Sequence, residues 1–170
     1  MTDIRYRRLL ANAKAPFRAT PDAAGLDVLA HLETEDGTLR FLKHPKGDVP
    51  ARKGRDGTSA WIEIPPFQRL LIPTGIAMAL GPDLYARAAP RSGLAFKEGL
   101  HILAGVIDRD FRAEYLILGC NTDPDTPMVV KHGQRIAQIV VERISLVTPV
   151  EDPDLDETAR GSGGFGSTGL

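Results

Sequence analysis

The segment at 160–169 reads RGSGGFGSTG and joins glycines to hydrogen-bond donors. Glycines allow a backbone to wrap closely around a ligand and to present N–H groups to an anion. Arg160, Ser167 and Thr168 add charged and hydroxyl donors, and Phe165 is an aromatic ring that can stack on a flat base. This composition suits a nucleotide polyphosphate, although a disordered Gly/Ser tail would share it. It is not a Walker-type loop, because it lacks the GK[ST] signature.

A second candidate phosphate-binding segment reads APRSG at 89–93. Pro90 ends a strand, and Ser92 and Gly93 can open a helix whose free N–H groups face an anion. Arg91 supplies a fork of donors for phosphate oxygens. A serine at this position is also an ordinary helix cap, so the segment alone leaves both interpretations open.

Carboxylates that follow apolar strands form the third group of candidates. Asp108 comes directly after the apolar run at 105–107 and could be a general base or a metal ligand, with Asp110 and Glu114 nearby. Aspartate is also common in turns, where it bonds its own backbone, and Asp27 has the same ambiguity. The four histidines lack metal-ligand spacing and Cys120 is the single cysteine, so we expect no zinc site.

Short apolar runs between glycines and prolines must position these residues, and they predict an all-β fold. The 17 glycines and 13 prolines favour many short strands over long helices. Such strands are typical of a sandwich, barrel or jelly roll. In the last run, Ile136, Gln138 and Val140 are expected to share one face. We expect strands at 26–30, 61–64, 70–72, 76–80, 84–89, 105–107, 115–120, 128–130 and 135–147, the last broken into two, and one short helix at 91–97.

Length and charge favour one soluble domain. With 21 basic and 22 acidic residues among 170, the net charge of -1 argues against a protein that coats nucleic acid or an anionic membrane. We expect a single domain at 1–147, a polar hairpin or insertion at 33–60 with one strand-like piece at 38–42, and a tether with a flexible arm at 148–170. The single cysteine and the lack of a long apolar run predict a cytoplasmic location, without membrane or direct nucleic-acid partners.

Five segments, taken in order, resemble the five motifs of the trimeric deoxyuridine triphosphatases (dUTPases). They are AGLD at 24–27, PRSGL at 90–94, GVID at 105–108, RIAQ at 135–138 and RGSGGFGSTG at 160–169. The resemblance implies a jelly-roll, β-clip-like homotrimer whose three active sites are shared between subunits. It also implies hydrolysis of dUTP to dUMP and pyrophosphate with Mg²⁺ held chiefly by the triphosphate, which limits uracil in DNA and supplies dUMP for dTMP synthesis.

The same resemblance implies a role for each matching residue. Asp108 would be the general base that activates the attacking water, and Asp27 would act on the metal through bound water. The uracil and deoxyribose would be bound by Gly105, Val106, Ile107, Phe111 and Leu116. The phosphates would be contacted from a neighbouring subunit by Arg91, Ser92, Gly93 and Gln138. A third subunit would supply Phe165 over the uracil and, for the β- and γ-phosphates, Arg160, Gly166, Ser167 and Thr168.

The chain departs from the family pattern in three places, and two other functions stay open. Phe111 stands where the family usually has tyrosine, Ala113 replaces a usual glycine, and the segment 33–60 is longer than usual. One alternative is a dCTP deaminase on a related jelly roll, with Glu114 activating water. The other is a nucleotide-sensing protein that uses 33–60 as a partner surface. The Arg-Ser-Gly motif and the glycine-rich arm favour the dUTPase.

Overall fold

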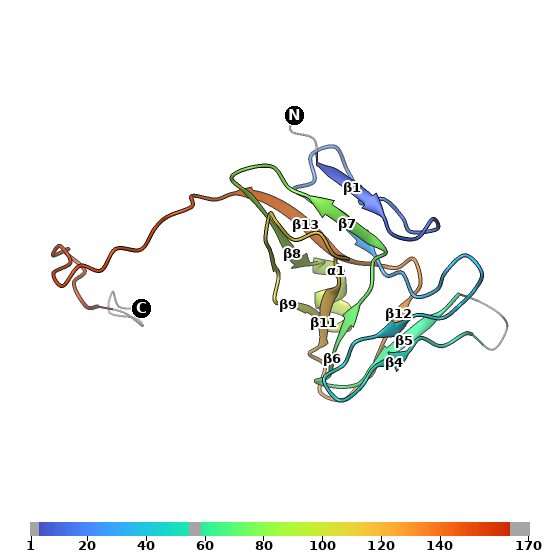
Figure 1. Ribbon diagram of the computed structural model, residues 1–170. Helices are drawn as coiled ribbons and strands as arrows, with labels where there is room; N and C mark the ends of the chain where they lie inside the picture. The colour runs from blue at the N-terminus through green and yellow to red at the C-terminus, as the bar shows by residue number, and fades with distance from the viewer. Residues whose placement is uncertain (1–3, 55–58, 164–170) are drawn as a thin grey trace.

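The computed structural model describes residues 4–54 and 59–163, which form short antiparallel strands and one short helix (Figure 1). Frequent Gly and Pro turns keep the strands short, as the composition predicts. The predicted arm residues Phe165, Gly166, Ser167 and Thr168 lie outside the described residues. The elements are β1 (Arg5–Arg8), β2 (Gly25–Leu29), β3 (Phe41–Leu42), β4 (Val49–Pro50), β5 (Trp61–Ile64), β6 (Arg69–Ile72), β7 (Ile76–Ala79), β8 (Leu84–Pro90), α1 (Ser92–Glu98), β9 (Leu100–Leu103), β10 (Val106–Ile107), β11 (Ile117–Asn121), β12 (Met128–Lys131) and β13 (Arg135–Arg143).

A four-stranded antiparallel sheet in the order β10-β8-β13-β2 carries four of the five motifs. Its longest strand, β13, pairs with β8 on one side and with β2 on the other. The sheet therefore brings together segments from the beginning, middle and end of the domain.

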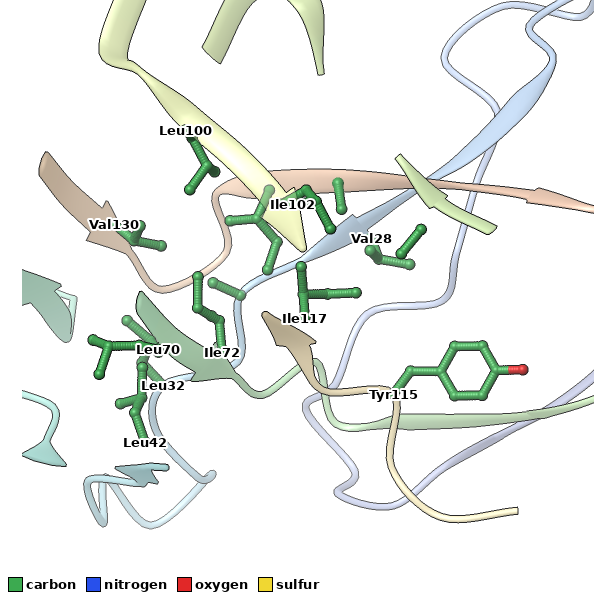
Figure 2. Packing of buried hydrophobic residues seen from close by; sticks show 14 of the residues in the cluster. Val28, Leu32, Leu42, Leu70, Ile72, Leu100, Ile102, Tyr115, Ile117 and Val130 are labelled. Carbon is green, nitrogen blue, oxygen red and sulfur yellow. The ribbon is translucent and has the colours of Figure 1, made fainter. Parts of the chain in front are cut away.

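The remaining strands form smaller sheets that enclose the core with the first. Their orders are β6-β11-β9, β12-β5, β1-β7 and β3-β4. Figure 2 shows Ile72, Ile102 and Ile117 converging between these layers, with Tyr115 at the edge of the cluster. Gly119 on β11 keeps this contact close, because a Cβ there would lie 2.9 Å from Ile72 Cδ1. The core thus fixes β11, which follows one of the motifs.

The last predicted run forms one strand from Arg135 to Arg143, so the predicted break into two strands is wrong. The register of β13 against β2 shifts between Arg135 and Ala137. Such an irregularity turns consecutive side chains to the same side, and Ile136 and Ala137 are both buried. Gln138 and Val140 are only half-buried, so the predicted shared face with Ile136 is interrupted there.

Three strands were not anticipated from the sequence. Every residue of β1 is exposed, so it lacks the alternation that marks a half-buried strand, and only pairing with β7 defines it. β9 begins directly after Gly99, the residue that ends α1, and β4 is two residues long. Pairing partners, which no local pattern reveals, account for all three.

The segment 33–60 contains the hairpin β3–β4 and joins the core in spite of its polar composition. Leu42, Ala51 and Ala60 are fully buried, and Lys43 bridges to Leu71 on β6. Beyond β13, residues 144–163 form no strand and extend away from the sheets (Figure 1). No helix in the described part of the chain is long and apolar enough to cross a membrane.

Candidate active site

The central sheet aligns the predicted residues Asp27 and Gln138 on neighbouring strands. Gln138 on β13 lies directly opposite Asp27 on β2 and opposite Ala89 on β8. Directly opposed residues of antiparallel strands project to the same face. Arg91 follows the end of β8, two residues after Ala89, and therefore lies in this same region. Three motifs that are far apart in sequence therefore meet here.

The carboxylate of Asp27 is the centre of this cluster and is 1% exposed. Arg135 Nη1 donates to its Oδ2 at 3.0 Å, and Gln138 Nε2 donates to its Oδ1 at 3.4 Å. Arg91 Nε lies 3.3 Å from Oδ1 as an ion pair, and its Nη1 donates to the Arg135 carbonyl at 3.3 Å. A buried charge requires such compensation, and Arg91 provides it through its charge, since its Nε makes no hydrogen bond.

Helix α1 begins directly after Arg91 and exposes its first turn. Arg91 has extended backbone angles, and Ser92 and Gly93 are exposed. The first N–H groups of a helix have no partner within it, so they are free to donate to an anion beside Arg91. A Cβ at Gly93 would meet nothing within 4 Å, which leaves room for a ligand against the backbone.

Strand β10, at the edge of the sheet, carries the predicted uracil-binding residues. A Cβ at Gly105 would lie 2.4 Å from the carbonyl oxygen of Ala88, so only glycine permits this approach. The Gly105 carbonyl accepts a hydrogen bond from the Ala88 N–H at 2.8 Å. Val106 is 67% exposed and Ile107 is half-buried. Because β10 has a neighbour on one side only, its outer backbone groups can pair with the edge of a base.

The loop after β10 holds Asp108 and Phe111. Asp108 is exposed, and its carbonyl accepts the N–H of Phe111 at 3.2 Å, which closes a turn. The ring of Phe111 is partly exposed and lies 5.9 Å from the ring of Tyr115. Leu116, directly before β11, is also partly exposed. The loop thus presents one carboxylate beside apolar side chains.

Asp108 and the phosphate-binding candidates lie far apart within one chain. Ile107 pairs with Ala86, whereas Arg91 follows the opposite end of β8. Five residues of antiparallel strand between Ala86 and Arg91 correspond to roughly 17 Å. One chain therefore does not place its own Asp108 next to its own Arg91.

Glu114, the candidate for a deaminase, is engaged in structural contacts. Its two carboxylate oxygens accept from Arg40 Nη1 at 2.8 Å and Arg40 Nη2 at 2.7 Å, and Oε1 also accepts from the Gly75 N–H at 2.6 Å. Burial alone would raise the pKa of Glu114, but the hydrogen bonds from Arg40 and Gly75 hold it below its usual value. A carboxylate held in this way is a poor proton acceptor.

His31 and His132 have structural roles too. His31 Nε2 bonds Asn12 Oδ1 at 2.7 Å, and His132 Nδ1 accepts from the Leu32 N–H at 3.1 Å. Within residues 4–54 and 59–163, no three His, Cys, Asp or Glu side chains are grouped so that they could hold a metal ion.

The structure adds two residues that the sequence reasoning passed over. Arg135 belongs to a predicted motif, but its contact with Asp27 depends on the irregular register of β13. Arg40 stands alone between apolar neighbours in a polar segment, and no sequence signal points to Glu114. In the predicted arm, Arg160 is exposed and its carbonyl accepts the Gly163 N–H at 3.0 Å. Residues 148–163, the described part of the predicted tether and arm, lie away from the central sheet (Figure 1).

Comparison with known proteins agrees with this arrangement. The sequence model of the dUTPase family matches residues 58–169. A deoxyuridine 5'-triphosphate nucleotidohydrolase of Arabidopsis thaliana is 37% identical over 166 residues, covering 98% of this chain and 82% of the relative. The protein of the same name from Paramecium bursaria Chlorella virus 1 is 34% identical over 170 residues, covering 100% of both chains.

Solved structures show the same fold. The Staphylococcus bacteriophage 80alpha dUTPase with dUpNHpp matches with a TM-score of 0.73 and 19% identity, covering 100% of both chains. The dUTPase of the S. aureus phage phi11, described with the coordination of a structural Mg(II) ion, matches with a TM-score of 0.68 and 17% identity, covering 92% of this chain and 100% of that one. The fold is thus the jelly roll of the dUTPases. From the sequence matches, the chain belongs to the dUTPase family.

Proposed function

We propose that this protein is a dUTP diphosphatase that hydrolyses dUTP to dUMP and pyrophosphate. The observation that carries the proposal is the central sheet, which joins the Asp27–Arg91–Gln138 cluster and the glycine-dependent edge strand β10 in one framework. In the cell this reaction would act on the cytosolic nucleotide pool, limiting uracil in DNA and supplying dUMP for dTMP synthesis.

The base and sugar would bind at β10 and the loop that follows it. The outer backbone of Gly105, Val106 and Ile107 offers the alternating donors and acceptors that the edge of uracil requires. Leu116 would complete the slot. The ring of Phe111 would pack against the deoxyribose and leave no room for a 2′-hydroxyl; this packing does not require the phenol oxygen that a tyrosine would add.

The triphosphate would bind at the Arg91 end of the sheet. Arg91, the N–H groups of Ser92 and Gly93, and the amide of Gln138 supply donors for phosphate oxygens. The ion pair with Asp27 keeps the Arg91 guanidinium at this end of the sheet, near where the phosphates would lie. From another subunit, the arm would close over the substrate with Arg160, Phe165, Gly166, Ser167 and Thr168, which excludes water.

Asp108 would act as the general base. Its carboxylate would hold one water molecule, take a proton from it and direct the oxygen to the α-phosphorus. The bond between the α-phosphorus and the bridging oxygen then breaks, and pyrophosphate leaves. Alignment and charge neutralisation provide most of the acceleration in phosphoryl transfer, so a single base is sufficient here.

The donor set fits magnesium that arrives with the substrate. The described residues hold no group of three potential ligands, and the Asp27 carboxylate is already bonded to two arginines. Asp27 would therefore contact the ion only through water. Magnesium would neutralise the triphosphate and orient it for in-line attack.

The separation of Asp108 and Arg91 supports a homotrimer with shared sites, which the family resemblance implies. With roughly 17 Å of strand between them in one chain, Asp108 of one copy would work with Arg91 of another. A closed ring of three identical copies satisfies this at every site.

The proposal is tested by product analysis with dUTP, dCTP, dTTP and UTP, each with and without Mg²⁺. We expect conversion of dUTP alone, to dUMP and pyrophosphate, and only with the ion. Deamination of dCTP would support the alternative enzyme. Binding of dUTP without turnover of any nucleotide would support a sensor.

Replacing Asp108 tests the base. Asp108→Asn keeps the size of the side chain but cannot accept the proton, so kcat should fall at least about 100-fold. Binding of the non-hydrolysable analogue dUpNHpp, measured by calorimetry, should change only a few-fold. A variant with near-normal kcat would exclude Asp108 from this role.

A further inference from the structure

The reaction described above does not use the segment 33–60. Through the side chain of Arg40, this segment forms an ion pair with Glu114, next to the loop that carries Asp108. We propose that Arg40 is a positioning residue for catalysis: its ion pair with Glu114 fixes the far end of the loop 108–113 and thereby sets where Asp108 holds the attacking water. The inference rests on the proposed function of Asp108.

The geometry of the Arg40–Glu114 pair is that of a stable contact rather than a transient one. Two parallel N–H···O bonds of 2.8 and 2.7 Å join the guanidinium to the carboxylate. The two side chains are only 20% and 17% exposed. Bidentate pairs of this kind constrain direction as well as distance, so each partner fixes the orientation of the other.

Glu114 passes this constraint to the backbone of the loop. Its Oε1 accepts the Gly75 N–H at 2.6 Å. The next residue, Tyr115, donates its N–H to the Ile76 carbonyl at 2.9 Å, and its carbonyl accepts from Thr74 Oγ1 at 2.7 Å. Residues 114–115 are therefore held against 74–76 on both sides, directly after Ala113.

The other end of the loop is fixed independently. There β10 pairs with β8, and Gly105 lies against Ala88. Between the two anchors, the Phe111 N–H to Asp108 carbonyl bond is the backbone contact within the turn. The position of Asp108 thus depends on both anchors, of which one requires Arg40.

Contacts other than the pair with Glu114 also hold Arg40 in place. Its backbone N–H donates to the Leu32 carbonyl at 2.9 Å, and its carbonyl accepts the Ala51 N–H at 2.9 Å. Its Nη1 lies 3.4 Å from both Nδ1 and the carbonyl oxygen of His31. The segment 33–60 therefore presents the guanidinium from a backbone that is bonded on both sides.

The other cations of this segment provide a contrast. Lys43 pairs with Asp48 inside the segment, with side chains 64% and 38% exposed, and Lys53 pairs with Glu33. Among the ion pairs of the described residues, Arg40–Glu114 is the one that joins this segment to the end of the Asp108 loop. Lys43 therefore supplies a control with the same charge and the same segment, but no contact with the loop.

Loss of Arg40 should reduce kcat more than it affects KM. A misplacement of about 1 Å at a reacting group can lower the rate roughly 100-fold. The phosphate-binding residues lie at the other end of β8 and should keep their geometry. Phe111, which would pack against the deoxyribose, belongs to the same loop as Asp108, so KM should rise, but by a smaller factor than kcat falls. If Arg40 had a purely structural role, its loss would lower the melting temperature without lowering kcat more than it changes KM.

The test compares Arg40→Met, Arg40→Lys and the control Lys43→Met, with kinetics at a temperature well below unfolding. We expect Arg40→Met to lower kcat about 10- to 100-fold with a smaller change in KM. Arg40→Lys should recover part of the loss, since it restores the charge without the fork. Lys43→Met should match wild type. If Arg40→Met keeps kcat within twofold, raises only KM, or is matched by Lys43→Met, the inference is wrong.

A second variant covers the case in which Arg40→Met does not fold. Glu114→Gln keeps an acceptor for the Gly75 N–H and removes the charge, so kcat should fall several-fold while the fold persists; unchanged kcat would overturn the inference. Wild-type and Asp108→Asn assays separate the two proposals. An inactive wild type overturns both, whereas an active wild type, an inactive Asp108→Asn and a normal Glu114→Gln overturn only the role of Arg40.

Discussion

At the scale of single residues, His31 shows how a buried polar side chain is kept neutral. Asn12 Nδ2 donates to the Glu33 carbonyl, which leaves Asn12 Oδ1 as an acceptor. The Nε2 atom of His31 must therefore carry the proton, and Nδ1 presents a lone pair to Arg40. Burial, with the nearby charges of Arg40 and His132, lowers the pKa of His31 to about 4.

This lowered pKa predicts a loss of stability on mild acidification. The unfolded chain binds a proton at His31 below the ordinary pKa of 6.5, whereas the folded chain resists it until about pH 4. The unfolded state therefore binds more protons in this window, and the free energy of unfolding should fall by up to about 3 kcal/mol between these pH values. The pKa of His132, lowered mainly by burial, acts in the same direction.

Denaturant titrations at pH 7, 5.5 and 4.5 would measure the effect. His31→Gln can donate to Asn12 and accept from Arg40 without titrating, so its stability should vary less with pH than that of wild type. His101→Gln, at an exposed site on β9, is the control and should keep the wild-type slope. Equal slopes for His31→Gln and wild type would show that His31 is not the group responsible.

At the scale of elements, the short strand β10 depends on its contact with β8. Two residue pairs are a small amount of pairing, and the approach of Gly105 to the Ala88 carbonyl extends it. A side chain at position 105 would push β10 away from the sheet. In the proposed function the same strand would offer its outer edge to the base, so strand pairing and substrate binding would both depend on one glycine.

Gly105→Ala should therefore affect stability and activity together. Its Cβ would contact a backbone oxygen at 2.4 Å, which cannot shift as a flexible side chain could. We expect a loss of about 2 kcal/mol, which lowers the melting temperature by several degrees, and at least a tenfold lower kcat/KM for dUTP.

The matched control is Gly81→Ala, where the nearest atom to a new Cβ is Leu84 Cδ1 at 3.7 Å, an ordinary van der Waals contact. Calorimetry and steady-state kinetics should find this variant close to wild type. A Gly105→Ala protein with unchanged melting temperature would argue against the close approach.

At the scale of the whole molecule, the distance between Asp108 and Arg91 leads us to expect that activity depends on the assembly. Each chain would carry both residues, yet each site would draw them from different copies. Two variants that are inactive alone can then restore each other, provided that they mix within one trimer.

Co-expression of Asp108→Asn and Arg91→Gln chains should therefore recover activity. In a random mixture, about one quarter of the sites would combine a normal Asp108 with a normal Arg91 from a different copy. Purified single variants mixed without unfolding should stay inactive and serve as the control. Sedimentation should give the mass of three chains, and a monomer or the absence of recovery would contradict shared sites.

Much of the fold and of the candidate site could be predicted from short stretches of the sequence. The motifs at 24–27, 90–94, 105–108 and 135–138 are short, and each keeps its functional side chains within a few residues. The same holds for most strands, since apolar runs between Gly and Pro turns have few other ways to bury themselves. Family membership and the all-β fold could therefore be predicted, as the comparisons confirm.

Contacts between distant positions could not be predicted in this way. Arg135 meets Asp27 across 108 positions, and Arg40 meets Glu114 across 74. Neither contact has a local signature, because strand pairing and an irregular register bring the partners together after the chain has folded. Residue types and spacing thus determined which functional groups this protein has available. The packing of the sheets determined which charged side chains pair and which end of β8 lies near each motif.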